Sequence, residues 1–178
     1  MIRKYWIIFT LLTAWSVAVL GGCGYFPKPD PIGDHPPVID DYFASPEIQW
    51  GHTWRIYIKA HDPDGDMWEV DFQIDQPGKL HAPGTGLVIL PKRLWAEIDG
   101  YFYFEILASP FALGYQNLTY YVQLIDRGER RSKKIKIPLH VGMKPALEAP
   151  ERFRDKPPLF RIPMDIHVEN DMWPSMVD

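Results

Sequence analysis

Three carboxylates stand close together in the segment Asp62-Pro63-Asp64-Gly65-Asp66. Asp62, Asp64 and Asp66 are two residues apart, and a glycine turn could bring their oxygens around a hard cation such as calcium. The twelfth position from Asp62 is Gln73, so the bidentate Glu of a helix-loop-helix calcium loop is missing. The same residues also suit an ordinary β-turn, because Pro, Asp and Gly all favour turns. The sequence leaves both interpretations open.

Cys23 is the only cysteine, and its surroundings suit acylation of its thiol. An uncharged, mostly apolar run from 5 to 20 follows Arg3 and Lys4, as in a signal peptide. This run is short for a bilayer span, which needs roughly 20 residues. The run ends in Leu20-Gly21-Gly22-Cys23, which resembles the lipobox of bacterial lipoproteins. The resemblance implies a signal peptide over 1–22, cleaved by signal peptidase II.

The resemblance also implies a location. Lipoproteins carry a diacylglyceryl group on this cysteine and often a third chain such as palmitate, and two or more acyl chains anchor a protein stably in a membrane. Residue 24 is Gly rather than the Asp that retains lipoproteins at the inner membrane, which favours the outer membrane. The alternative is an uncleaved membrane anchor with an incidental cysteine.

Charge and motifs exclude several functions. The chain has 19 basic and 23 acidic residues, and cleavage after residue 22 removes Arg3 and Lys4 but no acid, which leaves a net charge of −6. Nucleic-acid-binding domains are normally basic, so we expect no nucleic acid as a partner. The six His are scattered without metal-ligand spacing, and neither a G-x-S-x-G motif nor a glycine-rich phosphate loop is present. We therefore expect a non-enzymatic protein.

Proline marks the domain boundaries. Residues 24–37 contain five prolines and residues 143–178 contain six. The first stretch predicts a semi-rigid tether over 23–37 that begins at the acylated cysteine. One domain is expected over 38–142, and an extended tail over 143–178.

Apolar and polar residues alternate through the middle of the chain and predict β-strands. Four segments alternate clearly, with the even-numbered residues of the first three and the odd-numbered residues of the last pointing inward: 54–60, 68–75, 118–125 and 135–141. Shorter strands are expected at 38–43, 86–90 and 101–107. Asp99-Gly100 predicts a hairpin turn between 94–98 and 101–107.

About seven short strands separated by turns predict an all-β sandwich. Two segments, 56–66 and 120–128, resemble the B strand with its B–C turn and the F strand with its F–G turn of immunoglobulin-like domains, close to the PKD, cadherin-like and fibronectin type III groups. The resemblance implies a single antiparallel immunoglobulin-like β-sandwich. Cadherin-like repeats use similar acidic turns to bind calcium between adjacent repeats, whereas this chain has one such domain.

One outer face of the predicted sandwich is rich in Tyr and Arg. Arg55 and Tyr57 would lie beside Tyr101 and Tyr103, and these residue types are common at binding hot spots. Flat aromatic rings also stack on sugars. Outward Tyr residues can equally serve only to stabilise an exposed sheet. The inward or outward orientation of 101–107 is also open, since Phe102 and Phe104 could exchange places with the tyrosines.

The tail contains one more strand pattern. Residues 160–169 alternate strictly, and Pro163, which lacks an N–H, restricts such a strand to a sheet edge. It could fold back onto its own sandwich, or it could add a strand to a partner's sheet. Taken together, the sequence predicts a lipid-anchored interaction module of the bacterial cell envelope that binds another envelope protein. The alternatives are carbohydrate or peptidoglycan binding through exposed aromatics, and a calcium-dependent adhesion module.

Overall fold

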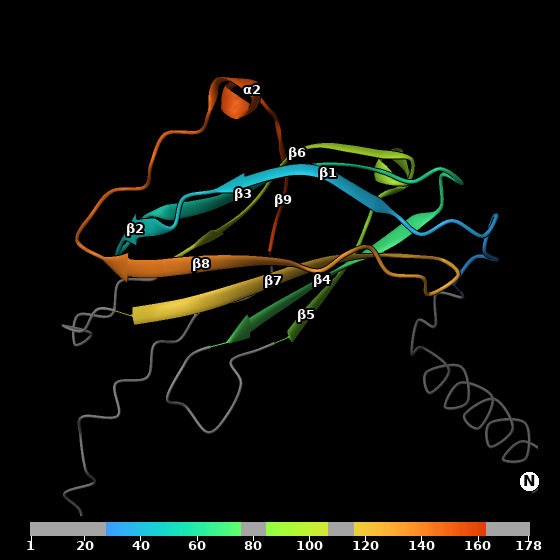
Figure 1. Ribbon diagram of the computed structural model, residues 1–178, viewed down its shortest axis with the longest axis horizontal. Helices are drawn as coiled ribbons and strands as arrows, with labels where there is room; N and C mark the ends of the chain where they lie inside the picture. Colours follow the sequence, from blue (N-terminus) through green and yellow to red (C-terminus); the bar gives the residue numbers. More distant parts are fainter. Residues whose placement is uncertain (1–27, 76–84, 107–115, 163–178) are drawn as a thin grey trace, which may run out of the picture.

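The computed structural model describes residues 28–75, 85–106 and 116–162 (Figure 1). The predicted signal peptide and Cys23 lie outside them. In chain order the elements are β1 (Val38–Ala44), β2 (Glu47–Gln49), β3 (Thr53–His61), β4 (Met67–Asp75), β5 (Thr85–Ile89), η1 (Lys92–Leu94), β6 (Glu97–Glu105), β7 (Gln116–Asp126), β8 (Ile135–Gly142), α2 (Glu151–Arg154) and β9 (Pro158–Arg161). Within these ranges, no helix is long and apolar enough to cross a bilayer.

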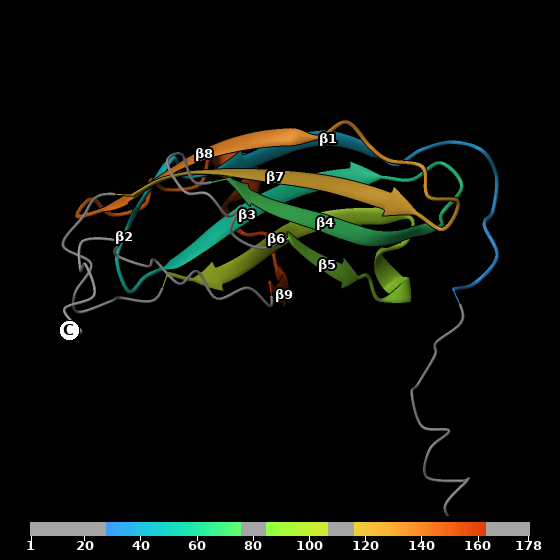
Figure 2. The ribbon, with the colours of Figure 1, turned by 90° about the horizontal axis from the view of Figure 1, so that it is seen from below.

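The strands form two sheets packed face to face, as Figures 1 and 2 show. One sheet has the order β1-β3-β6-β9, and the other has the order β2-β8-β7-β4-β5. With β1, β3 and β6 as strands A, B and E, and β4, β7 and β8 as strands C, F and G, this is the strand order of immunoglobulin-like sandwiches. The predicted fold class is confirmed. The sheets are mixed rather than purely antiparallel, because β2 pairs parallel to β8 and β9 pairs parallel to β6.

The core lies between the sheets and follows the predicted alternation except at the start of β4, where a register shift between Met67 and Glu69 buries Met67 in place of Trp68. Ile56, Phe72, Leu124 and Ile137 are among the buried residues that the four alternating segments point inward. Trp54, Phe104 and Tyr120 pack together at one end, with ring centroids 4.8 to 5.1 Å apart. In β6 the phenylalanines Phe102 and Phe104 point inward, which settles the orientation of that strand.

The predicted turn at Asp99-Gly100 is wrong, because both residues lie inside β6. Gly100 is needed there for another reason. A Cβ atom at this position would lie 2.7 Å from the side chain of Leu159 and 2.7 Å from the carbonyl oxygen of Pro157. The glycine therefore lets the returning tail approach the strand closely, a long-range requirement that local sequence does not reveal.

The tail returns to its own domain. Residues 143–157, called the strap below, rise from the end of β8 and cross outside β1 and β3 to β9 (Figure 1). β9 then pairs with β6, at the sheet edge where strand D lies in immunoglobulin domains. The predicted strand over 160–169 is thus observed as Pro158–Arg161, and its remaining residues from 163 onward lie outside the described part of the chain.

Candidate functional site

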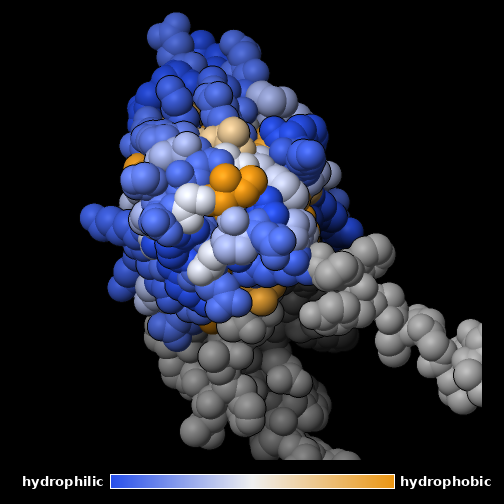
Figure 3. Space-filling view, turned by 90° about the vertical axis from the view of Figure 1, so that its right-hand side faces the viewer, coloured by the Kyte–Doolittle hydropathy of each residue, from blue (hydrophilic) through white to orange (hydrophobic). Residues whose placement is uncertain are grey.

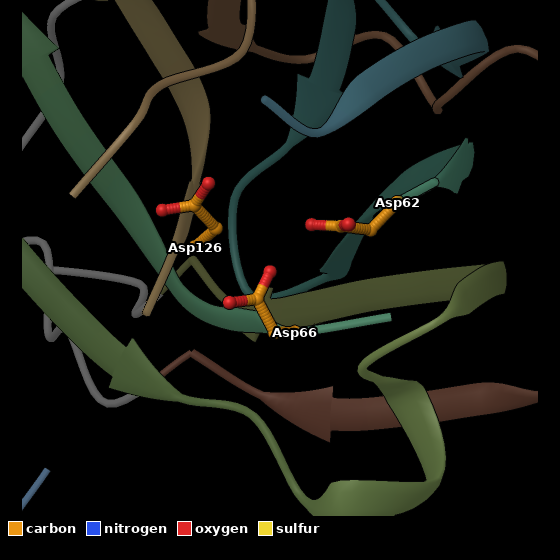
Figure 4. Close-up of side chains that lie close together, drawn as sticks. All are labelled: Asp62, Asp66 and Asp126. Atoms are coloured by element: carbon orange, nitrogen blue, oxygen red, sulfur yellow. The ribbon is translucent and has the colours of Figure 1, made fainter. Parts of the chain in front are cut away.

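Three buried carboxylates meet at one end of the sandwich (Figure 4). Asp62 directly follows β3, Asp66 directly precedes β4, and Asp126 is the last residue of β7. One oxygen from each lies within 4.8 Å of the others. Asp62 is 5% exposed, and Asp66 and Asp126 are fully buried. We call these three residues the carboxylate cluster.

Local hydrogen bonds explain how the cluster is held. The Oδ1 atom of Asp62 accepts hydrogen bonds from the backbone N–H groups of Asp64 (2.9 Å) and Gly65 (3.0 Å), which closes an Asx-type turn. Asp126 accepts from the backbone N–H of Arg130 (2.8 Å) and from its guanidinium Nε (2.7 Å). The backbone N–H of Arg127 donates to the carbonyl of Asp66, which ties the two loops together.

Two oxygens of the cluster have no hydrogen-bond partner among the described residues. They are Oδ2 of Asp62 and Oδ1 of Asp66, and both are buried. Burial, together with the neighbouring charges of Asp66 and Asp126, raises the pKa of Asp62. The cluster therefore concentrates negative charge, and within the described part of the chain Asp126 is the one of the three that forms an ion pair, with Arg130.

Only two of the three aspartates that the sequence predicts as a calcium site lie together in the structure. Asp62 and Asp66 belong to the cluster, whereas Asp64 turns toward residue 35. The Asp64 carboxylate accepts a hydrogen bond from the backbone N–H of His35 at 2.6 Å and lies 3.2 Å from the His35 ring nitrogen. The hydrogen bond from that N–H, and then the one with the ring, hold the pKa of Asp64 below its usual value. Sequence reasoning missed Asp126. Its position in the expected F–G turn was a usable signal, because the B–C and F–G loops share one end of such a sandwich.

The described part of the predicted tether, residues 28–37, docks on this same end (right in Figure 1). The Asp66 Oδ2 atom accepts from the backbone N–H of Ile32 at 2.7 Å. The guanidinium of Arg130 donates to the Gly33 carbonyl at 2.6 Å, and that of Arg127 donates to the Pro29 carbonyl at 3.1 Å. Figure 3 looks onto this end and shows a mainly hydrophilic surface. The segment is therefore bound to the domain and is not a free spacer.

Gly33 makes this docking possible. Its φ of +72° is a conformation that favours glycine, and a Cβ atom there would lie 2.1 Å from the carboxyl carbon of Asp64. No larger residue fits between the tether and the β3–β4 loop.

A second site lies at the opposite end, beneath the strap. The strap is fastened by ion pairs of Lys144 with Glu47 and Arg152 with Asp41, and by a hydrogen bond from the Leu147 N–H to the Ser45 hydroxyl. It forms a half-open cavity of about 430 Å³ against the outer face of β1 and β3. We call this cavity the strap cleft; it is lined by Phe43, Ser45, Thr53, Trp54, Arg55, Tyr57, Ala146, Leu147, Glu148, Ala149 and Arg154.

The four predicted binding residues have different environments. Tyr57 is only 6% exposed, because Phe153 of α2 packs on it with ring centroids 5.7 Å apart. Tyr101 and Tyr103 are half-buried, and the guanidinium of Arg55 lies 5.2 Å from the Tyr101 ring centroid. Arg55 is exposed and lines the strap cleft together with Tyr57. The strap thus converts the expected flat aromatic face into a hollow.

Another apolar surface lies on β5. Leu87 and Ile89 are 61% and 59% exposed on the outer face of this edge strand. They sit opposite Asp71 and Glu69 of β4 in the strand register. Nothing in the described residues covers this pair, so it serves as a reference surface when partner binding is tested.

No known protein family and no curated protein matches the sequence. Among solved structures, the chain is similar to the CARDB domain of a Pyrococcus furiosus protein, solved in complex with di-metal ions. The similarity covers 65% of this chain and 99% of that chain, with 12% sequence identity and a TM-score of 0.30. Likeness of this degree carries no argument about function or metal binding, and the immunoglobulin-like assignment rests on the strand order given above.

Proposed function

We propose that the chain is a lipid-anchored, non-enzymatic interaction module of the bacterial cell envelope that binds another envelope protein through the strap cleft. The observation that carries this proposal is the position of the cleft relative to the tether. Residues 28–35 dock at the β3–β4 end, whereas the cleft lies at the start of β3. The nine residues of β3 separate the two ends by about 30 Å.

Acylation at Cys23 would orient the domain relative to the membrane. Cys23 stands five residues before Lys28, so the docked segment begins at most about 17 Å along the chain from the lipid. The carboxylate-cluster end would then lie close to the membrane, and the strap cleft would face away from it. Absence of an Asp after Cys23 supports the outer membrane as the location.

The chemistry of the cleft indicates the kind of partner. Arg55 and Arg154 line it, and neither forms an ion pair with a described residue. Phe43, Tyr57 and Leu147 contribute apolar surface. A protein segment that carries an acidic group beside an apolar side chain complements both features, since Arg pairs strongly with carboxylates and aromatic residues anchor interfaces.

Charge reversal in the cleft tests this proposal. The double variant Arg55→Glu with Arg154→Glu is expected to lose a partner that crosslinks to the wild-type chain in cells. Lys136→Glu is a matched control, because Lys136 is exposed on the other sheet. Equal recovery of the same partner by both variants would show that binding does not use the cleft.

A calcium-dependent module is the second candidate function. The unpaired Asp62 and Asp66 oxygens favour it, because oxygen ligands suit calcium. For such a module, chelation of calcium would release the partner, even though the cleft lies at the far end of the sandwich. Partner recovery that is the same with calcium and with chelator would exclude calcium dependence and leave the cleft proposal intact.

A further inference from the structure

Folding alone does not account for the carboxylate cluster. Burying an ionised carboxylate is costly unless it is paired and hydrogen-bonded. Arg130 provides both for Asp126. The turn requires only Oδ1 of Asp62, and the tether requires only Oδ2 of Asp66. The other oxygen of each has no partner among the described residues, although both atoms are buried beside Asp126.

The spacing and chemistry of these oxygens match a hard divalent cation. The three residues offer only carboxylate oxygens, and one oxygen from each lies within 4.8 Å of the other two. Calcium binds oxygen at about 2.3–2.6 Å and can therefore bridge oxygens up to about 5 Å apart. Magnesium binds at about 2.0–2.1 Å, so its ligands lie at most about 4.2 Å apart. This upper limit lies within the span of a calcium shell and exceeds that of a magnesium shell, so calcium suits the cluster better.

We propose that Asp62, Asp66 and Asp126 form a calcium site, and that the bound ion locks the tether segment 28–35 onto the domain. The site differs from the three aspartates of the β3–β4 turn, because Asp126 of β7 is a ligand and Asp64 is not. It joins the ends of both sheets, since Asp62 follows β3 and Asp126 ends β7.

The link to the tether follows from shared residues. Asp66 faces the cluster with one oxygen and accepts from the Ile32 N–H with the other. Arg130 bonds Asp126 and also donates to the Gly33 carbonyl. An ion that fixes these two carboxylates therefore fixes the groups that hold the tether. By thermodynamic linkage, a docked tether must in turn strengthen ion binding.

Calcium titration of the full chain, purified with its lipid in detergent, tests the site. Millimolar calcium is expected to raise the melting temperature by about 5 °C or more, and magnesium by much less. Asp66→Asn is expected to weaken calcium binding, measured by calorimetry, at least about tenfold. Asp155→Asn is the matched control and should bind calcium with unchanged affinity, because Asp155 is exposed just after α2, outside the cluster. Asp64→Asn should lose less affinity than Asp66→Asn, because Asp64 holds the tether but is not a ligand.

Three results would overturn the site. They are no calcium response in the wild-type chain at 10 mM, an unchanged affinity in Asp66→Asn, or a loss of binding in Asp64→Asn that equals the loss in Asp66→Asn. Should Asp66→Asn not fold, Asp62→Asn replaces it, because that variant keeps the acceptor that closes the turn.

Hydrogen exchange tests the lock separately. Calcium is expected to slow exchange of the Ile32 and His35 amides several-fold, since both donate to aspartates of the β3–β4 loop. Calcium binding without this protection would refute the lock while leaving the site. Either result is independent of partner capture by the strap cleft, so failure here is distinguishable from failure of the interaction proposal.

Discussion

Asp62→Asn is expected to stabilise the protein when no calcium is present. The carboxylate of Asp62 is buried beside Asp66 and Asp126, and its Oδ2 atom has no partner among the described residues. Asparagine keeps the oxygen that accepts from the N–H groups of Asp64 and Gly65. The asparagine NH2 group would replace the unpaired Oδ2 of Asp62 with two hydrogen-bond donors. Oδ1 of Asp66, in the same cluster, is an acceptor that lacks a donor among the described residues.

The magnitude follows from the geometry. Two unit charges within 4.8 Å of each other repel by at least about 3.5 kcal/mol at an effective dielectric constant of about 20. Arg130 offsets part of this repulsion through Asp126. We therefore expect a gain of about 1–3 kcal/mol in the free energy of unfolding, which corresponds to a rise of about 3–10 °C in melting temperature.

The pH dependence has a definite sign. The folded pKa of Asp62 is above its unfolded value of 3.8, so its charge costs stability at neutral pH. This cost shrinks as pH falls through the folded pKa and disappears below the unfolded value. The advantage of Asp62→Asn over the wild-type chain should therefore fade between neutral pH and about pH 4.

Urea unfolding at pH 7 in chelator, and again at saturating calcium, measures both effects. At a calcium concentration 100 times the wild-type dissociation constant, the wild-type chain should gain about 2.7 kcal/mol, and a variant that binds at least tenfold more weakly should gain at most about 1.4 kcal/mol. A variant that is less stable than the wild-type chain in chelator would refute the account of Asp62 as an uncompensated buried charge.

Three further predictions concern the strap and β9. Phe153→Ala should lower the free energy of unfolding by about 3 kcal/mol in urea titration, because Phe153 is buried against Tyr57, and a loss below about 1 kcal/mol would mean that the strap contributes little to stability. Gly100→Ala should displace β9 and speed amide exchange of Ile162, whose N–H donates to the Tyr103 carbonyl, and unchanged exchange would contradict the close approach argued from Leu159. Arg152→Gln should destabilise the protein slightly at pH 7, because the hydrogen bond from Arg152 lowers the pKa of Asp41. A carboxylate with a lowered pKa stabilises the folded state only while it is ionised, so the stability difference from the wild-type chain should vanish between about pH 5 and pH 2. A pH-independent difference between Arg152→Gln and the wild-type chain would assign the effect to packing.

Much of the fold could be predicted because it depends on local alternation. The inward residues of β3, β7 and β8 follow directly from period-two patterns, since successive side chains of a strand point to opposite faces. The parallel strand β9 could not be predicted in this way, because its pairing with β6 depends on how the strap crosses the sheet. The same crossing explains why residue 100 is a glycine. The pair Asp99-Gly100 predicts a turn only because these two residue types are common in hairpin turns.

The candidate sites could likewise be predicted only where their residues are neighbours in the sequence. Asp62 and Asp66 could be identified because they lie in one short acidic turn, but Asp126 comes 60 residues after Asp66 and joins them only through the sandwich topology. Tyr57 was correctly placed on the outer face of its strand. Its burial could not be foreseen, since Phe153 reaches it from a segment whose sequence predicts only an extended tail.

Photo-crosslinking in cells tests the proposed function most directly. A photoreactive residue at Leu147, which lines the strap cleft, is compared with one at Leu87, which is exposed on β5 of the other sheet. Our account predicts one discrete crosslinked envelope protein from position 147, lost when Arg55 and Arg154 are reversed in charge, and none from position 87. The same partner crosslinked from position 87 but not from position 147 would contradict the assignment of the strap cleft as the binding surface.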